Sequence, residues 1–463
     1  MTRAIHWFRQ DLRLSDNPSF FEAAEHDEIF PVYILDNQNP GEYSLGAASR
    51  WWLHHSLTEL HRELDGNLSL FTGDPLEVLV SLMARNDIDA VFWNRHYEPW
   101  LIGRDEQIKK SLKDMGAVVQ TRNGSLLWEP WTILKKDETP YKVFSPFYKK
   151  GCLNAASPRF PLVKPDVKTL KKDNQSLAIS NLNLLPKIYW YEGIEKLWQP
   201  GERGAQIRLK SFLNDGLNGY KVGRDFPAAR KHSRLSPSLR FGELSPNQVW
   251  YAAKENNFAH APSEDLAHFL SELGWREFSY NLLYHFQNLP EKNLRQNFDL
   301  FRWSLNEEYL NAWKQGQSGI PFVDAGMREL RQTGYIHNRV RMVVASFLVK
   351  NLLIDWREGQ RWFWDCLLDA DLASNSASWQ WVAGSGADAA PYFRIFNPVL
   401  QGRKFDPEGT YTRRFVPQLR DLPNKFLHSP WEAPESVLQE ANIILGANYP
   451  FPVVNLKESR QKA

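Results

Sequence analysis

The sequence has few cysteines, no long apolar runs and almost no net charge. Its two cysteines, Cys152 and Cys366, cannot build a disulfide framework, and no run of cysteine and histidine has the spacing of a zinc site. No segment approaches the roughly 18 uninterrupted apolar residues of a membrane helix, and charge appears early in the N-terminal stretch. These absences predict a cytoplasmic protein that is neither exported nor membrane-spanning, and they predict no metal site.

Neither positive nor negative charge dominates the sequence. The chain of 463 residues has 56 Lys and Arg against 54 Asp and Glu, a net charge of +2. Any preference for a polyanion must therefore come from local clustering of basic residues. With 43% hydrophobic residues the chain can bury a large core, which excludes a disordered protein and leaves room for two domains or more.

Several common catalytic motifs are also missing. The sequence contains no P-loop, no nucleophile elbow and no H-E-x-x-H, so the corresponding kinases and hydrolases have no direct support. The glycines of "AGSGAD" (383–388) do not complete a G-x-G-x-x-G, and we interpret them as a turn.

Aromatic residues, by contrast, are abundant: the chain has 19 Trp, 27 Phe and 16 Tyr. The segment "NSASWQW" (375–381) places two tryptophans two residues apart, behind serines that would otherwise indicate a turn. So many rings in one protein indicate a use for them beyond core packing.

The order of the patterns predicts two domains of different class. Up to about residue 130, four short apolar runs alternate with helical patterns, which predicts a doubly wound α/β domain with a parallel sheet (1–130). Residues 131–200 lack periodicity and carry ten Lys or Arg between Lys135 and Lys172, as expected of an inter-domain linker. From there the apolar stripes are helical, which predicts an all-α domain (201–463).

Two helical segments each gather polar groups on one face. Glu272, Trp275 and Arg276 share a face by the i, i+3, i+4 rule, and the simplest explanation is a core tryptophan beside a surface ion pair of Glu272 with Arg276. In "HNRVRM" the same rule groups Asn338, Arg341 and Met342, whereas Arg339 points elsewhere. A capped, charged helix is the alternative there.

Short polar residues cluster in two further stretches. Asp369, Asp371 and Asn375 precede the paired tryptophans, although aspartates most often cap helices. The turn-rich "KHSRLSPSLRFGELSP" leads into helices with three serines and two arginines, namely Ser233, Ser236, Ser238, Arg234 and Arg240. Hydroxyls and backbone N–H groups before a helix suit a phosphate, and a solvated serine loop is an equally open reading.

In order and spacing, five segments of the chain resemble the photolyase and cryptochrome family, and within it the microbial class I cyclobutane pyrimidine dimer DNA photolyases. These segments are "WFRQDLRLSDNP", "SRLSPSLRFGE", "ELGWREF", "GYIHNRVRMVVASFLVKNLLIDWREG" and "NSASWQW" with "DAAPYFRIFNP".

The resemblance implies FAD in the helical domain. The residues it assigns to the cofactor are Tyr220, His232, Ser233, Arg234, Leu235, Ser236, Arg341, Asp369, Asp371 and Asn375. Tyr220 and residues 232–236 would bind the phosphates, and Arg341 would pair with Asp369. Asn375 would lie opposite the flavin N5, where an amide favours the reduced cofactor; the plant receptors of the family carry an aspartate there.

The resemblance also implies an electron relay and a DNA-binding face. Trp379, Trp356 and Trp303 would pass electrons from the surface to the flavin. The flipped dimer would contact Glu272, Trp275, Asn338, Met342 and Trp381. DNA binding would involve Arg224, Glu272, Trp275, Asn338, Arg339, Arg394 and Gln401. Burial of Glu272 beside Trp275 and the bases should raise the pKa of its carboxyl, so we expect it to be neutral in the complex.

The implied function is light-driven repair of cyclobutane pyrimidine dimers in UV-damaged DNA by a monomer that needs no protein partner. The alternative is a cryptochrome-type blue-light receptor. A nucleotide-binding α/β enzyme would leave the helical motifs without a purpose. Repair of (6–4) photoproducts is disfavoured because Asn338 follows His337 where that branch has two histidines.

Two positions depart from the family pattern. His232 replaces a threonine and is expected to change flavin affinity or make it depend on pH. Leu101 stands where folate-binding relatives have a glutamate, so the antenna chromophore is open between methenyltetrahydrofolate, a deazaflavin and none.

Overall fold

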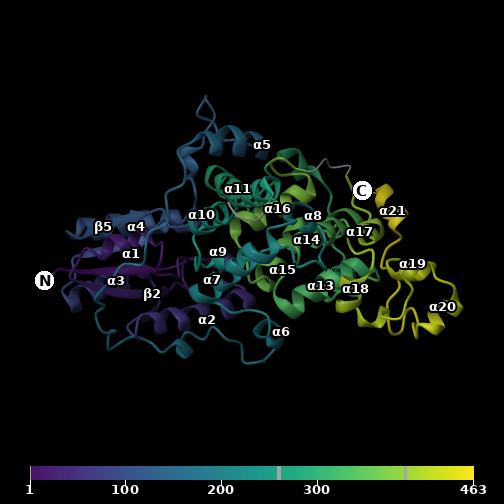
Figure 1. The fold of residues 1–463 in the computed structure, drawn as a ribbon, viewed down its shortest axis with the longest axis horizontal. Helices are drawn as coiled ribbons and strands as arrows, with labels where there is room; N and C mark the ends of the chain where they lie inside the picture. The colour runs from purple at the N-terminus through teal and green to yellow at the C-terminus, as the bar shows by residue number, and fades with distance from the viewer. Residues whose placement is uncertain (1, 258–261, 390–393, 463) are drawn as a thin grey trace.

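The structure is a computed structural model that describes residues 2–257, 262–389 and 394–462. Its α/β part lies at one end of the molecule and the helices after residue 200 at the other (Figure 1). The strands are β1 (Arg3–Phe8), β2 (Glu28–Leu35), β3 (Ser69–Thr72), β4 (Ala90–Asn94) and β5 (Val118–Arg122). The helices between them are α1 (Pro18–Ala23), α2 (Ala47–Glu63), α3 (Pro75–Asn86) and α4 (Pro99–Asp114).

The five strands form one parallel sheet in the order β3-β2-β1-β4-β5. The chain therefore adds β2 and β3 on one side of β1, then returns and adds β4 and β5 on the other side. Side chains alternate along β1: Ile5 and Trp7 join the core under α3 and α4, whereas Ala4 and Phe8 join the core under α1 and α2. Burial on both faces explains why the strands are apolar runs. The predicted doubly wound sheet is confirmed, with β5 added to the four expected strands.

Residues 131–200 contain only two short α-helices, α5 (Phe144–Pro146) and α6 (Glu192–Glu195). The segment nevertheless lies against the sheet: Ile29 N donates to Lys168 O (3.0 Å), and Leu170 N donates to Ile29 O (2.8 Å). Ile194 and Trp198 pack in the same core as α1 and α2. The segment therefore acts as packed structure around the α/β part, and the three domain limits given above stay our proposal.

The helical part confirms the predicted all-α class. Its α-helices are α7 (Glu202–Ser211), α8 (Tyr220–Gly223), α9 (Ser236–Arg240), α10 (Pro246–Asn257), α11 (Ser263–His285), α12 (Glu307–Gln315), α13 (Pro321–Thr333), α14 (Asn338–Ser346), α15 (Trp356–Cys366), α16 (Leu372–Ala383), α17 (Pro398–Phe405), α18 (Thr410–Phe415), α19 (Asn424–Leu427), α20 (Glu435–Glu440) and α21 (Leu456–Lys462).

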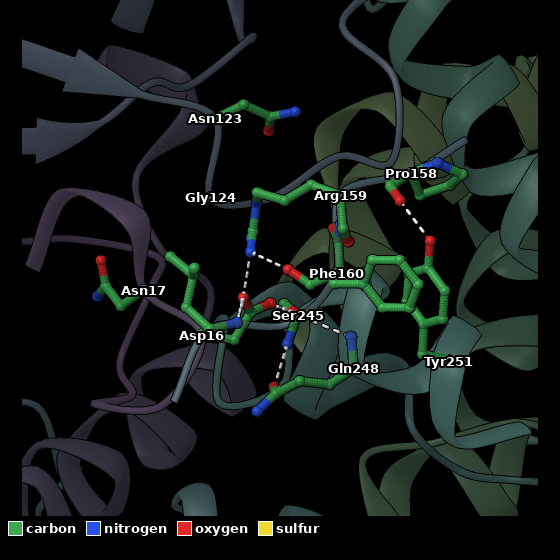
Figure 2. Close-up of polar contacts among 12 residues, drawn as sticks. Asp16, Asn17, Asn123, Gly124, Pro158, Arg159, Phe160, Ser245, Gln248 and Tyr251 are labelled. Atoms are coloured by element: carbon green, nitrogen blue, oxygen red, sulfur yellow. Dashed lines mark hydrogen bonds and ion pairs between the residues drawn. The ribbon is translucent and has the colours of Figure 1, made fainter. Parts of the chain in front are cut away.

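A buried carboxylate joins the α/β part to the helical part (Figure 2). Asp16 follows β1, is 0% exposed, and accepts hydrogen bonds from Arg159, from Ser245 before α10 and from Leu162 N (2.8 Å). Tyr251 of α10 donates to Pro158 O (2.5 Å). One acid thus links its own loop to two other segments, residues 159–162 and the start of α10.

Within the described residues, no helix is long and apolar enough to cross a membrane. The same part of the chain brings no three His, Cys, Asp or Glu side chains together in a way that would hold a metal ion.

Candidate functional site

Helix α16 carries the predicted site residues Asn375, Trp379 and Trp381, and a fourth, Asp371, directly precedes it. Asp371 caps its N-terminus by accepting from Ser374 N (2.7 Å), and the hydroxyl of Tyr280 in α11 donates to the same carboxylate. Gly384 ends the helix in the left-handed region (φ 95°). The segment 375–381 is therefore helical, since the cap and the packing against α11 and α15 outweigh the turn preference of its serines.

Asp369 holds two other predicted residues. Arg341 Nη2 donates to both of its oxygens (3.0 and 2.7 Å), and Ser236 Oγ donates to Oδ2 (2.6 Å). The expected pairing of Arg341 with Asp369 is present. It ties α14 to the start of α9, so the serine-containing turn is fixed in place before any ligand binds.

The turn at residues 232–236 holds the side chains of His232 and Arg234 against each other. Arg234 has a left-handed backbone (φ 53°), and its Nε donates to His232 Nε2 (3.0 Å), which leaves the proton of the neutral ring on Nδ1. That atom is buried, and the backbone carbonyl of Ala229 is its hydrogen-bonding neighbour, which opposes part of the fall in the pKa of the ring. The half-buried hydroxyl of Ser233 and guanidinium of Arg234 offer donors in the same turn, which fits a phosphate, as proposed for FAD.

The His232 ring stays neutral over the physiological range. Burial, and then the charge of Arg234, lowers the pKa of His232 to about 4. A pH dependence of flavin affinity through His232 is therefore expected only in acid. In the same region, Tyr220 is buried at the start of α8, Ser233 is half-buried and Leu235 is buried in the core around α11.

The amide of Asn375 is oriented by its neighbour. Its Nδ2 donates to Gln360 O (3.0 Å) in α15, while Gln360 Nε2 donates to Ser376 Oγ (2.9 Å). The carbonyl Oδ1 of Asn375 keeps its acceptor capacity. The side chain is thus preset to accept a hydrogen bond at the position that the resemblance places opposite the flavin N5.

The three relay tryptophans lie in one hydrophobic cluster, and of the three Trp303, the expected surface member, is the most exposed. Trp379 and Trp356 are 2% and 0% exposed, whereas Trp303 is half-buried at the edge of the cluster. Gly359, one turn after Trp356 on α15, lies so close to the Trp379 ring that an added Cβ would be 2.0 Å from it. A backbone hydrogen bond fixes the segment that contains Trp303: Ser304 N donates to Leu353 O (2.7 Å), just before α15.

Glu272 has a different partner from the one that the helix spacing suggests. Its carboxylate forms a two-point ion pair with Arg224, with Nη2 donating to Oε2 at 2.9 Å. Arg276 instead donates to Ser125 O (2.7 Å) and lies 3.2 Å from Glu277. The alternative prediction, an ion pair of Glu272 with Arg276 at i+4, was therefore wrong. The Arg276 guanidinium instead binds the backbone of the α/β part at Ser125.

Trp275 is held by a residue that the sequence analysis did not identify. Phe144 of α5 stacks on the indole with ring centroids 3.8 Å apart and planes 9° from parallel. Trp275 and Trp381 are both half-buried, so each presents part of a ring to solvent. A lone phenylalanine in a basic segment carries no local signal of this contact.

The remaining predicted DNA contacts fall into two groups. Arg339 pairs with Asp225 (2.7 Å), its Nη1 lies 3.9 Å from Met342 Sδ, and Asn338 is exposed beside it at the start of α14. The second group is Arg394, which is exposed and precedes α17, and Gln401, which is half-buried on α17. Among the described residues, no contact joins either of these side chains to the first group. Leu101, the position considered for the antenna, is 4% exposed within α4 and offers no polar group to a pterin.

Known families and proteins match both parts of the chain. Residues 4–165 match the family DNA photolyase, and residues 269–463 match the FAD binding domain of DNA photolyase. The chain belongs to the photolyase and cryptochrome family. The deoxyribodipyrimidine photo-lyase of Agrobacterium fabrum is 48% identical over 99% of this chain and 96% of its own length. Cryptochrome-1 of Arabidopsis thaliana is 36% identical over 99% of this chain and 69% of its own length.

A solved structure refines the resemblance. A bacterial class III photolyase from Agrobacterium tumefaciens matches with a TM-score of 0.96 and 46% identity, covering 100% of this chain and 96% of that one. The expected relation to class I enzymes is thereby corrected to a class III relative, since the motifs used are shared across the family. Membership of the photolyase enzymes and FAD as cofactor are confirmed.

Proposed function

We propose that the protein repairs cyclobutane pyrimidine dimers in UV-damaged DNA with light. When bound, reduced FAD supplies the photoexcited electron that splits the dimer. The proposal is supported by the amide of Asn375, which is neutral and has its Oδ1 free to accept a hydrogen bond. An aspartate there would add negative charge beside a reduced cofactor and favour the oxidised one.

The dimer site consists of Glu272 with Trp275 and Trp381. Each of the two partly exposed indoles offers an apolar face to a flipped pyrimidine dimer, and damage lowers the cost of flipping because the stack is already disturbed. The carboxyl of Glu272 donates to a pyrimidine carbonyl only when protonated. We therefore propose that Arg224 leaves Glu272 for a DNA phosphate and that Glu272 takes up a proton as the dimer enters.

Two substitutions of Glu272 test this role. Glu272→Gln keeps a donor but loses the carboxylate, so the repair yield per absorbed photon should stay close to that of the wild type. Glu272→Ala has no donor, so its yield at saturating DNA should fall. Glu264→Ala is the matched control, since Glu264 lies on the same helix and forms an exposed pair with Lys221.

Equal yields in all three variants, with a lower melting temperature for both changes at Glu272, would limit Glu272 to its ion pair with Arg224. Illumination of the FAD-loaded enzyme with a dimer-containing oligonucleotide, followed by thymine absorbance, measures the yield.

A light-receptor function is the second candidate, favoured by the identity with Cryptochrome-1 over nearly the whole chain. A receptor retains FAD and photoreduction but restores no thymine absorbance. The same illumination experiment therefore separates the two functions.

Three further assignments accompany the proposal. Trp303, Trp356 and Trp379 carry electrons inward to restore reduced FAD, and the remaining predicted residues bind cofactor or DNA as assigned above. The protein acts as a cytoplasmic monomer, which light scattering of the free and DNA-bound forms would test. A methenyltetrahydrofolate antenna would add near-ultraviolet absorbance when folate is supplied, and its absence would favour a deazaflavin or no antenna.

A further inference from the structure

A pocket of about 340 Å³ lies beside Trp303. Its wall is built from the 3-10 helix Gln296–Leu300, the segment that follows it, the π-helix Phe347–Asn351 and the end of α16. The side chains that matter for its chemistry are Phe298, Leu300, Phe301, Trp303, Lys350 and Leu353. The volume is at the lower end of the range found for small-molecule sites.

The wall is apolar although it faces solvent. Leu300 is 85% exposed and Phe301 is 37% exposed, and the Phe301 ring lies 4.4 Å from that of Trp303 between centroids. Large apolar side chains grouped at a hollow surface usually mark a binding site. Rings and a leucine favour a flat, apolar ligand that stacks or packs edge-on against them.

One cation lines the same pocket. Lys350 donates from Nζ to Arg394 O (3.1 Å), and burial together with the charge of Arg394 lowers the pKa of Lys350 to about 8. The ammonium is therefore still mainly protonated at neutral pH. A positive charge in an apolar wall favours a ligand with one anionic group on a flat body.

The position of the pocket limits its ligand further. Trp303 is the outermost of the three relay tryptophans, so any molecule in the pocket contacts the ring at which an electron must enter. A redox-inactive ligand would block that entry. The pocket therefore favours a donor of electrons.

We propose that this pocket binds a small aromatic hydroquinone with an anionic substituent, which reduces oxidised Trp303. The inference rests on the relay of the proposed function. After an electron has moved inward, the Trp303 radical cation releases its N–H proton to water. The hydroquinone then gives one electron and one proton to the neutral indole radical, and two of the resulting donor radicals disproportionate to one quinone and one hydroquinone.

The test uses FAD-loaded protein with oxidised cofactor, a light flash and hydroquinone sulfonate as the probe. The decay rate of the tryptophan radical, followed by transient absorption, should reach a plateau as the probe concentration rises, because the donor binds before it reacts. Neutral hydroquinone and ascorbate are comparison donors, since the first lacks the charge and the second lacks the aromatic ring.

Leu300→Ser should raise the half-saturating concentration of hydroquinone sulfonate about fivefold, from the lost contact of one leucine. Leu305→Ser is the matched control: Leu305 is 73% exposed in the same segment but does not line the pocket, so its curve should match the wild type. Lys350→Met should weaken binding of the sulfonate but not of hydroquinone.

A rate that rises linearly with every donor and is equal in Leu300→Ser and the wild type would overturn the pocket and leave the relay intact. If no tryptophan radical forms, the relay and the pocket both fail, whereas repair by chemically reduced enzyme still tests the dimer site. If the decay rate reached a plateau at the same concentration of ascorbate as of hydroquinone sulfonate, the pocket would bind anions in general. That result would overturn the proposal that it selects an aromatic donor.

Discussion

Glu243 should make the stability of the protein fall between weakly acid and neutral pH. This residue lies between α9 and α10, is 0% exposed, and accepts at Oε1 from Trp52 Nε1 of α2 (2.8 Å) and from Gly201 N (2.6 Å). Burial raises the pKa of Glu243 from 4.5 to about 7. The carboxyl at this contact between the sheet and helical parts is therefore protonated in weak acid.

The sign follows from the raised pKa. The folded protein binds the proton more tightly than the unfolded chain, so the stabilisation is complete below the unfolded pKa and is lost as pH rises through the folded pKa. A difference of about 2.5 pKa units corresponds to roughly 3 kcal/mol in total, of which about 2 kcal/mol falls between pH 5 and pH 7.5.

Glu243→Gln removes this titration and keeps an Oε1 acceptor for Trp52 and Gly201. The unfolding entropy of a 463-residue chain is about 1 kcal/mol per kelvin, so the variant should gain about 2 °C in melting temperature over the wild type between these two pH values. Calorimetry at both pH values measures the difference, with Glu106→Gln, an exposed change on α4, as the control.

Parallel melting curves for the wild type and Glu243→Gln across the whole range would refute the reasoning. They would mean that the site accommodates the ionised carboxylate as well as the neutral one.

Three other perturbations give separate outcomes. Trp303→Phe should block light-driven reduction of oxidised flavin while dithionite-reduced enzyme still repairs dimers; the exposed Trp190→Phe is the control, and equal loss of both activities would contradict the relay. Arg339→Ala should weaken binding to dimer-containing DNA and flatten its dependence on salt, because one phosphate contact is lost; binding that is insensitive to salt in the wild type would disprove this. Asp16→Asn should lower the melting temperature by about 2 °C, since asparagine tolerates the positive φ of 49° but loses the charged bonds to Arg159 and Ser245, worth about 2 kcal/mol; an unchanged melting temperature would show that this carboxylate does not hold the domains together.

The sequence alone determined the features that depend on neighbours along the chain. Alternating apolar runs and helical stripes predicted the parallel sheet and the all-α part, since burial on both faces of a sheet and on one face of a helix leaves periodic patterns. The capping role of Asp371 and the turn at Gly384 were equally local. Resemblance to a family supplied the candidate residues for cofactor, relay and DNA.

Tertiary structure decided which of these residues meet. Glu272 pairs with Arg224, 48 positions away, although Arg276 is one helical turn from it, and Phe144 covers Trp275 from a segment that looked like a linker. Long charged side chains reach many partners, so the choice among them depends on where the fold places each helix. The same holds for the pocket at Trp303, whose wall comes from three separate stretches of the chain and has no signature in any one of them.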